Sequence, residues 1–358
     1  MAISLIVPKR TSAVDGGVVC GTDYLLLGAI LVFTFFSVIT DAYSGIAEIG
    51  AGFSKNSRWA IDLSSRVVND LESHHSASTH VLGFDYHKVL TDDFGDIGTL
   101  VFQPYIVKLN NVPNPPFFFD DGDDTELTWR IANFNYTALS EGKFNIRAGH
   151  FEIPFGLEQN IDSNGTLRQY TFSDRGIKAD WGISINGILP SLEYEVALTR
   201  GSGNDIESRG DPYVFAGRIG LPSHRNLIAG LSWFHGDVLG GNGITKRDRV
   251  GLDVAYYQHH WELLFELSGG DDDGGDRVNS LMEVSWRNAK ENLHLYIQWI
   301  HLRLKQDSQW EAGDDVKTGI SWRFINDFEL SAQYQKQIDM IGQEDKPALF
   351  ILQVRWRI

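Results

Sequence analysis

Charged side chains recur at every second position in segments whose remaining positions are apolar. Arg323 stands between Trp322 and Phe324, and Tyr194 stands between two glutamates. Because side chains alternate between the two faces of a β-strand, each such segment has one charged face and one apolar face. Charges on one face of a sheet can line a passage for water and ions. The residues that we predict to line such a wall are Arg218, Arg287, Arg323, Arg355, Glu193, Glu195, Glu262 and Glu283.

Residues that could support other chemistries lack the required spacing. No G-x-S-x-G elbow is present, and the pairs His74-His75 and His259-His260 do not have the spacing of an H-E-x-x-H zinc motif. Cys20 is the only cysteine, which excludes a disulfide framework within the chain. We therefore expect no enzyme, no metal site and no cofactor. The formal net charge of −16 argues against a nucleic-acid partner.

The first 44 residues have the features of a secretory signal peptide. An apolar run over 24–39 follows Lys9 and Arg10, and small residues at Ala42 and Ser44 lie where a cleavage site is expected. An uncleaved anchor helix is the alternative. The run is short for a membrane span, which favours the signal peptide at 1–44 and leaves one domain at 45–358.

Sixteen segments of this domain are predicted strands, and no long stretch shows helical periodicity. The strands cover 57–69, 78–91, 97–109, 125–138, 143–153, 179–189, 191–200, 212–221, 225–236, 248–258, 260–269, 277–288, 292–304, 315–325, 327–338 and 347–358. Short turns alternate with longer polar linkers at 70–77, 110–124, 154–178, 201–211, 237–247, 270–276, 305–314 and 339–346. Membrane barrels alternate short periplasmic turns with longer outer loops. The prediction is an all-β fold, a transmembrane antiparallel up-and-down β-barrel with both chain ends in the periplasm. A secreted soluble β-sandwich is the alternative.

Aromatic residues gather toward the predicted strand ends, as expected for the two interfaces of a membrane. If odd-numbered strands run outward, one girdle lies at the periplasmic end and the other at the outer end. The residues concerned are Trp261, Trp286, Trp322, Phe328 and Trp356 at the first end, and Trp129 and Trp181 at the second. In 125–138 the alternation changes phase before Phe134, which predicts a β-bulge.

The linker 154–178 is the longest of the predicted outer loops, and it carries charges of both signs. Sixteen strands enclose an aqueous channel, and a loop of this length can fold inward and narrow it. We predict that the pore constriction is formed by Arg130 and Arg147 from the wall and by Glu158, Asp162, Arg168 and Arg175 from the loop. The alternative is an external loop whose charges are solvated.

Residues 147–158, RAGHFEIPFGLE, carry the run G-x-F-x-x-P-F-G-x-E, in which the fixed positions are Gly149, Phe151, Pro154, Phe155, Gly156 and Glu158. This run resembles the strand-to-third-loop segment of the phosphate-selective porin O/P group and its relatives. The resemblance implies an outer-membrane barrel of sixteen strands with an inward third loop, assembled as a homotrimer. Phosphate-selective members line the pore with an arginine ladder and a lysine cluster, whereas the predicted lumen here carries both signs. Barrels also commonly end in an aromatic residue, where this chain has Ile358.

Together these features predict a porin of the bacterial outer membrane, a passive diffusion channel for small hydrophilic solutes or ions. Its expected partners are outer-membrane lipid and lipopolysaccharide, further copies of itself in a trimer, and the transported solutes. Acidic runs such as Asp271-Asp272-Asp273 could hold divalent cations that bridge to lipopolysaccharide, or they are solvated surface. The second hypothesis for the function is a barrel that sheathes a partner such as a multihaem electron carrier. The solute and the ion preference are left open.

Overall fold

The structure is a computed structural model, and it describes residues 53–54, 56–93, 95–159, 164–170, 174–205, 210–306, 309–339 and 347–358. The predicted signal peptide at 1–44 lies outside these residues. Nearly all of the described chain is strand, together with one turn of 3₁₀-helix, η1 (Leu157–Gln159). The strands are β1 (Phe53–Ser54), β2 (Ser57–Asp70), β3 (Ser76–Asp92), β4 (Gly95–Asn110), β5 (Thr125–Tyr136), β6 (Asn145–Glu152), β7 (Ala179–Ile188), β8 (Glu193–Thr199), β9 (Tyr213–Gly220), β10 (Leu227–Gly240), β11 (Gly243–Gln258), β12 (Trp261–Asp272), β13 (Gly275–Arg287), β14 (Leu293–Gln306), β15 (Gln309–Ile325), β16 (Phe328–Asp339) and β17 (Ala348–Arg357). Among the described residues, no helix is long and apolar enough to cross a membrane.

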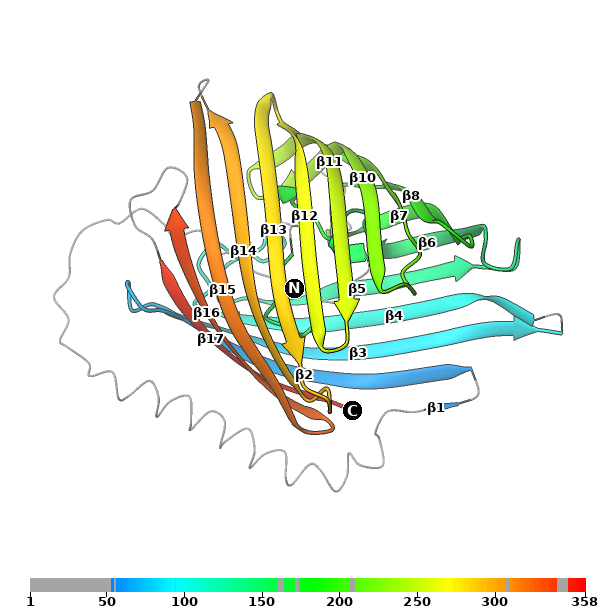
Figure 1. The fold of residues 1–358 in the computed structure, drawn as a ribbon, viewed down its shortest axis with the longest axis horizontal. Helices are drawn as coiled ribbons and strands as arrows, with labels where there is room; N and C mark the ends of the chain where they lie inside the picture. The colour runs from blue at the N-terminus through cyan, green and yellow to red at the C-terminus, as the bar shows by residue number, and fades with distance from the viewer. Residues whose placement is uncertain are drawn as a thin grey trace.

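The sixteen strands β2 to β17 close into one antiparallel barrel. Each strand pairs with the next along the chain, and β17 returns to pair with β2 from Leu349 opposite Asp70 to Arg357 opposite Asp62. Figure 1 shows β16 and β17 lying beside β2, where the first and last parts of the sheet meet. The short β1 pairs with the start of β2. Closure confirms the predicted barrel, and the two-sheet sandwich is wrong.

All sixteen predicted strands are present, but three of the predicted linkers are themselves strand. Segments 237–247, 270–276 and 305–314 continue the ladders of β10 to β15, so that β10 ends at Gly240 and β11 begins at Gly243. The strict alternation of long loops and short turns is therefore wrong. The three longest connections are 111–124, 153–178 and 200–212. They all leave one end of the barrel, which we call the loop end, and the opposite end is the turn end.

Cross-strand ion pairs explain why these polar segments extend the sheet. Asp272 on β12 lies 2.6 Å from Arg249 on β11 and 2.9 Å from Arg277 on β13. Lys305 on β14 lies 2.7 Å from Asp276 on β13. Opposite charges on neighbouring strands stabilise their pairing. Polar residues in these segments predicted loops. They belong instead to hairpins that project beyond the apolar band of the barrel.

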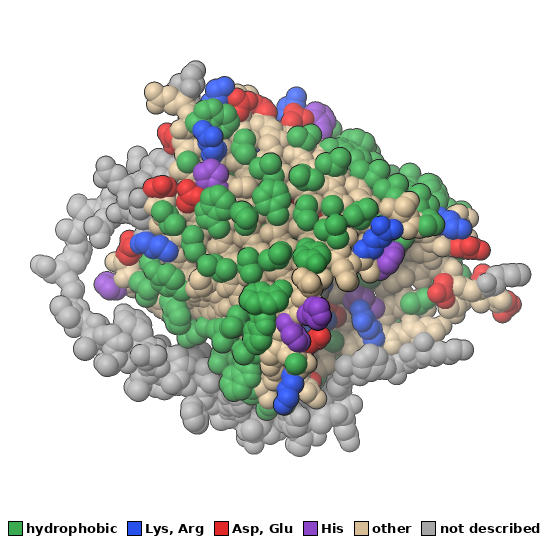
Figure 2. Space-filling model, in the orientation of Figure 1, with side chains coloured by type: hydrophobic (Ala, Val, Ile, Leu, Met, Phe, Trp, Pro, Cys, Tyr) green, Lys and Arg blue, Asp and Glu red, His purple; other side chains and the backbone are tan. Residues whose placement is uncertain are grey.

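The outer surface of the barrel is apolar around its middle. Leu231 on β10 is 59% exposed, whereas the next residue, Ser232, is 4% exposed and faces inward. The same alternation holds on β7, where Ile183 and Ile185 are exposed beside the buried Ser184. Figure 2 shows hydrophobic side chains spread over the middle of one face, with charged side chains gathered toward its edges. A closed sheet with this exterior satisfies the two demands of hydrocarbon, paired backbone groups and an apolar surface.

Aromatic residues at the turn end confirm one predicted girdle. Trp261 pairs with Trp286 across β12 and β13, and Trp322 on β15 is 49% exposed. Phe328 stacks on Trp356 with ring centres 5.9 Å apart, and both are buried. Nearer the loop end, Trp129 and Trp181 lie 6.0 Å apart. The predicted bulge is also confirmed, since the pairing of β4 with β5 shifts between Gln103 and Pro104.

We expect that Leu231→Arg will destabilise the barrel. The charge would stand among Ile219 and Leu252 on the neighbouring strands, on the face that meets hydrocarbon. An arginine on the lipid face costs about 2–4 kcal/mol near the bilayer midplane. Unfolding in denaturant of protein refolded into lipid vesicles measures this loss, with Leu231→Phe as the apolar control. Equal stability of the two variants would contradict the assignment of this face to lipid.

Candidate functional site

The inward face of the barrel carries ion pairs between strands that are adjacent or two apart in the sheet. Arg218 on β9 lies 3.3 Å from Glu193 on β8 and 2.6 Å from Asp253 on β11. Arg147 on β6 lies 3.0 Å from Glu195 on β8. Others nearer the barrel ends are Arg355 with Asp62, Arg287 with Glu262 at 3.6 Å, and Arg323 with Glu329 at 3.7 Å. The residues predicted for the lumen wall are thus brought together in oppositely charged pairs.

The motif at 149–158 turns the chain from β6 toward the interior. Gly149 and Gly156 both have positive φ, of 124° and 64°, a conformation that favours glycine. A Cβ on Gly149 would lie 2.2 Å from the carbonyl oxygen of Ala132, and one on Gly156 would lie 2.1 Å from a carboxylate oxygen of Glu266. Phe155 is buried beside Val214, Phe234 and Val238, which project inward from β9 and β10. The motif therefore fixes the point where segment 153–178 meets the far wall.

We expect that Gly156→Ala will loosen this attachment. The methyl group would displace the Glu266 carboxylate, which accepts a hydrogen bond of 2.7 Å from the backbone N–H of Leu157. Single-channel recording should show larger current fluctuations than in the unsubstituted protein. Gly142→Ala is the matched control, because Gly142 also has positive φ, 81°, yet has open space around the added atom. Identical traces for the two variants would show that the Gly156 contact does not hold the segment.

Arg175 forms the centre of the first anchor of segment 153–178. Its guanidinium lies 2.8 Å from Glu158, 3.0 Å from Asp174 and 3.3 Å from Glu266 on β12. It also lies 4.3 Å from the ring centre of Phe155, within the range of a cation–π contact. The Arg175 side chain is 2% exposed, so this cluster is shielded from solvent.

The pKa of Glu158 lies well above the usual range of a glutamate. Burial outweighs the attraction of Lys178 and Arg175 and raises the pKa of Glu158 to about 7. The charge of this anchor therefore depends on pH near neutrality.

Arg168 forms the centre of the second anchor. It lies 3.1 Å from Glu262 on β12 and also pairs with Glu283 on β13. The neighbouring Gln169 accepts a hydrogen bond of 2.9 Å at its backbone oxygen from Gln298 on β14, and its side-chain oxygen accepts one from Lys317 on β15. Segment 164–170 thus reaches four consecutive strands that are distant from β6 and β7.

A third set of contacts ties backbone oxygens of the segment to β17 and β2. Arg355 donates to the carbonyl of Asn164 at 3.0 Å, and Gln353 donates to that of Gly165 at 2.5 Å. Arg66 donates to the carbonyl of Thr166 at 3.1 Å. Arg66 and Gln353 were not among the predicted site residues, although Gln353 alternates with the apolar Leu352 and Val354 in its strand. Arg66 and Gln353 hold the segment only because the segment passes close to β2 and β17.

The residues predicted for the constriction have different positions. Glu158, Arg168 and Arg175 lie in the two anchors, and Asp162 lies outside the described residues. Glu195, the partner of Arg147, also accepts a hydrogen bond of 3.0 Å from Gln159, which joins that wall pair to the segment. Arg130 lies at the β5 bulge and donates to Gln103 at 2.7 Å.

The connection 111–124 also differs from the polar linker that was predicted. Phe119 and Val112 are buried against Val107 and Leu109, which project inward from β4. Asp123 accepts a hydrogen bond of 2.8 Å from the backbone N–H of Asn111, which helps to close the connection on itself. The sequence feature that could have indicated this inward packing is the run of three phenylalanines at 117–119, which is unusual for a solvated loop.

Acidic residues of this connection bind the chain's own backbone. Asp121 accepts a hydrogen bond of 2.7 Å from the N–H of Asp123, and Asp124 accepts one of 3.0 Å from the N–H of Asp120. No group of three or more histidine, cysteine, aspartate or glutamate residues suited to a metal ion is found in the part of the chain that the structure describes.

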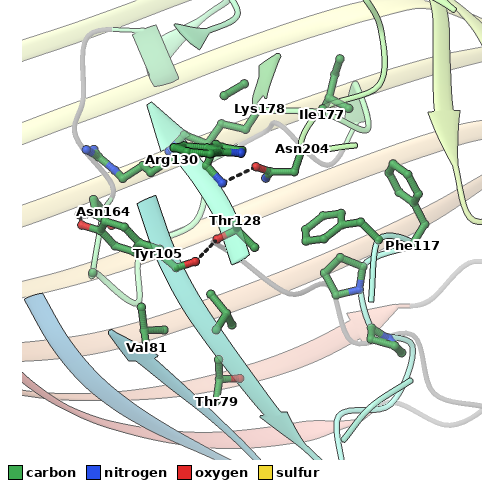
Figure 3. Close-up of a pocket in the computed structure, with 18 of the residues that line it drawn as sticks. Thr79, Val81, Tyr105, Phe117, Thr128, Arg130, Asn164, Ile177, Lys178 and Asn204 are labelled. Atoms are coloured by element: carbon green, nitrogen blue, oxygen red, sulfur yellow. Dashed lines mark hydrogen bonds between the residues drawn. The ribbon is translucent and has the colours of Figure 1, made fainter. Parts of the chain in front are cut away.

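A cavity of about 520 Å³ lies between segment 153–178 and the wall formed by β2 to β5. Figure 3 shows Phe117 on one side of it and Arg130 and Asn164 on the other, with Tyr105 and Thr128 between. The hydroxyl of Tyr105 accepts a hydrogen bond of 2.8 Å from Asn164 and lies 3.1 Å from Asp85. Within β5 the backbone N–H of Trp129 donates a hydrogen bond to the side-chain oxygen of Asn204, 2.7 Å away in the connection 200–212.

Comparison with known structures supports the architecture. The barrel is similar to that of an anion-selective porin from Comamonas acidovorans, with a TM-score of 0.61, 13% identity and coverage of 84% of this chain and 99% of that one. This chain has the porin fold. Salmonella typhi OmpF in complex with daunomycin is similar with a TM-score of 0.63 and 10% identity, over 86% of this chain and 100% of that one. Pseudomonas putida OprB is similar with a TM-score of 0.62 and 11% identity, over 85% and 94%. The sequence matches no protein-family model and no curated protein.

Proposed function

We propose that this protein is a channel of the bacterial outer membrane through which small hydrophilic solutes or ions diffuse passively. The observation that carries the proposal is a closed barrel of sixteen strands with an apolar exterior and charged side chains on its inner face. Barrels of this strand number enclose an aqueous channel rather than a core filled by side chains. The likeness to porins supports the same function.

Segment 153–178 narrows this channel. This part of the proposal is supported by the contacts described above, which join the segment to β12 through β15, to β17 and to β2. Solutes then pass on the side of the cavity, between the segment and β2 to β5. Arg130 faces this path from the wall, whereas Arg147 pairs with Glu195 beside it. The anchored charges of Glu158, Arg168 and Arg175 hold the segment in place.

The channel is not an enzyme, and it works as a homotrimer in contact with lipid and lipopolysaccharide. A trimer form is described for OmpT of Vibrio cholerae, whose barrel is similar to this one with a TM-score of 0.59. The motif at 149–158 favours membership of the phosphate-selective O/P group within the porins. The sheath for an electron carrier is less favoured, because the chain's own segment bridges strands on different sides of the interior.

Reconstitution and fractionation test this function together. Protein extracted from outer membranes and added to a planar bilayer in KCl should produce discrete, ohmic current steps. The protein should also fractionate with the outer membrane and require detergent for extraction. A protein found in the soluble periplasmic fraction, or one that inserts without conducting, would contradict the proposal. Copurification of a coloured haem protein would favour the sheath instead.

A further inference from the structure

The cavity beside segment 153–178 has an apolar side that packing holds in place. Phe117 and Phe118 pack edge to face with ring centres 5.7 Å apart, and the ring centre of Phe118 lies 5.0 Å from that of Phe119. Phe119 is buried against inward-facing residues of β3 and β4, so it positions the other two rings, which are only partly buried. Pro115 and Pro116 also line this side and restrict the backbone that carries the rings.

The wall across the cavity offers uncharged hydrogen-bonding groups. Ser64 on β2, Thr79 on β3 and Thr128 on β5 line it with hydroxyl groups, and Asn204 lines it with a side-chain amide. In Figure 3, Thr79, Thr128 and Asn204 surround the space beside Phe117. The hydroxyl groups of Ser64 and Thr79 and the amide NH₂ of Asn204 hydrogen-bond to no residue that the structure describes, so they can bind a solute.

These two sides fit a solute that has both an apolar face and several hydroxyl groups. The C–H groups on one face of a sugar ring form a flat surface that can pack on an aromatic ring, and the hydroxyl groups at its edge need hydrogen-bond partners. A volume of about 520 Å³ lies within the range of small-molecule sites, which combine an apolar lining with a few convergent polar groups. An inorganic ion has no apolar face to place on the phenylalanines. A plain aromatic molecule would leave the polar groups of the wall without partners, which weakens binding.

We propose that this cavity is a binding site for uncharged carbohydrates. The sugar ring packs on Phe117 and Phe118. Its hydroxyl groups hydrogen-bond to Ser64, Thr79 and Asn204. The proposal rests on the channel function and names a solute class for it. A sugar bound here lies in the path between segment 153–178 and β2 to β5, so it should obstruct the ion current while it is bound.

Reduction of the KCl current in a planar bilayer tests the site with three probes. Maltose has sugar rings and hydroxyl groups, sorbitol has hydroxyl groups on an open chain, and benzyl alcohol has an aromatic ring with one hydroxyl group. Maltose should reduce the current saturably, with a half-blocking concentration about tenfold lower than that of either other probe, because only maltose uses both sides of the cavity. Phe117→Ala should raise the half-blocking concentration of maltose about tenfold, and Thr79→Val about fivefold.

Two matched variants serve as controls. Phe144→Ala removes an exposed phenylalanine at the turn end, and Thr318→Val removes an exposed hydroxyl group on β15. Neither residue lines the cavity, so both variants should leave the maltose block unchanged. The KCl conductance of each variant shows that it folds and inserts, and Thr79→Val decides the test if Phe117→Ala does not insert.

The outcomes separate this inference from the channel function. An open channel that maltose and sorbitol block equally, or that benzyl alcohol blocks more strongly than maltose, would overturn the carbohydrate site and leave the channel function standing. A maltose block that Phe117→Ala and Thr79→Val leave unchanged would overturn this cavity as its site. Absence of any current from correctly inserted protein would overturn both the site and the channel function.

Discussion

Replacing residues 158–175 with a short Gly-Ser linker is expected to raise the single-channel conductance severalfold. The replaced stretch contains both anchors, Arg168 with Glu262 and Glu283, and Arg175 with Glu266. Without them, the connection between β6 and β7 keeps only the contacts that residues 153–157 and 176–178 make with the nearby wall. The free cross-section of the barrel would then carry the current. Planar-bilayer recording in KCl measures the step size directly.

The control for this replacement inserts a Gly-Ser pair at the Asp273-Gly274 turn between β12 and β13. That turn closes a hairpin that projects from the loop end, outside the cavity. The conductance of this insertion variant should equal that of the unsubstituted channel. If removal of 158–175 also leaves the conductance unchanged, the segment does not obstruct the pore, although the barrel could still conduct.

Arg175→Met is expected to detach the segment at its first anchor. The substitution removes the cation that Glu158, Asp174 and Glu266 share, and all three are almost fully buried. Asp174 keeps a longer contact of 3.7 Å with Arg249. Loss of one partner from a buried ion pair costs about 3–5 kcal/mol. The rate of chymotrypsin cleavage at Tyr170, which is buried in the intact protein, should therefore increase strongly. Channel recordings should show a larger and noisier current.

Two further variants test whether loss of the buried ion pairs causes the faster cleavage. Arg175→Lys keeps the charge but loses the planar fork, so it should give an intermediate cleavage rate. Arg323→Met removes a cation whose pair with Glu329 is 3.7 Å long and half exposed. An exposed pair contributes about 0–1 kcal/mol, and this variant should behave as the parent does. Cleavage rates that are the same for Arg175→Met and Arg323→Met would contradict the anchor.

The barrel could be predicted from the sequence because its signal is local. Lipid on one side and water on the other force polar and apolar residues to alternate, as at Leu231 and Ser232, and each strand shows this pattern by itself. The hairpins at 240–243 and 272–275 were mistaken for loops for a related reason. Beyond the lipid the alternation ends, and the ion pairs that extend the sheet join residues such as Arg249 and Asp272 on different strands.

The interior contacts could not be predicted because they depend on closure. Arg168 and Glu283 are far apart in sequence, and no periodicity relates them. Their pairing follows only after the barrel has closed and segment 153–178 has been directed inward. The motif at 149–158 could be recognised in the sequence, because its glycines are required by the backbone conformation and its Phe155 by the wall that it meets. The inward fold of 111–124 was missed because its phenylalanines lie between prolines and acidic residues.

The alternation of water-facing and lipid-facing side chains along a strand can be tested at two neighbouring residues. Cys20 is the only natural cysteine and lies in the predicted signal peptide at 1–44, so the chain from residue 45 onward gives a background without thiols. On β3, Val81 lines the cavity and Leu82 is exposed on the outer face. A charged methanethiosulfonate reagent added to the aqueous phase should reduce the current of Val81→Cys within the bilayer and leave that of Leu82→Cys unchanged. Equal reaction at both positions, or reaction at 82 alone, would contradict a barrel with a water-filled inside and a lipid-facing outside.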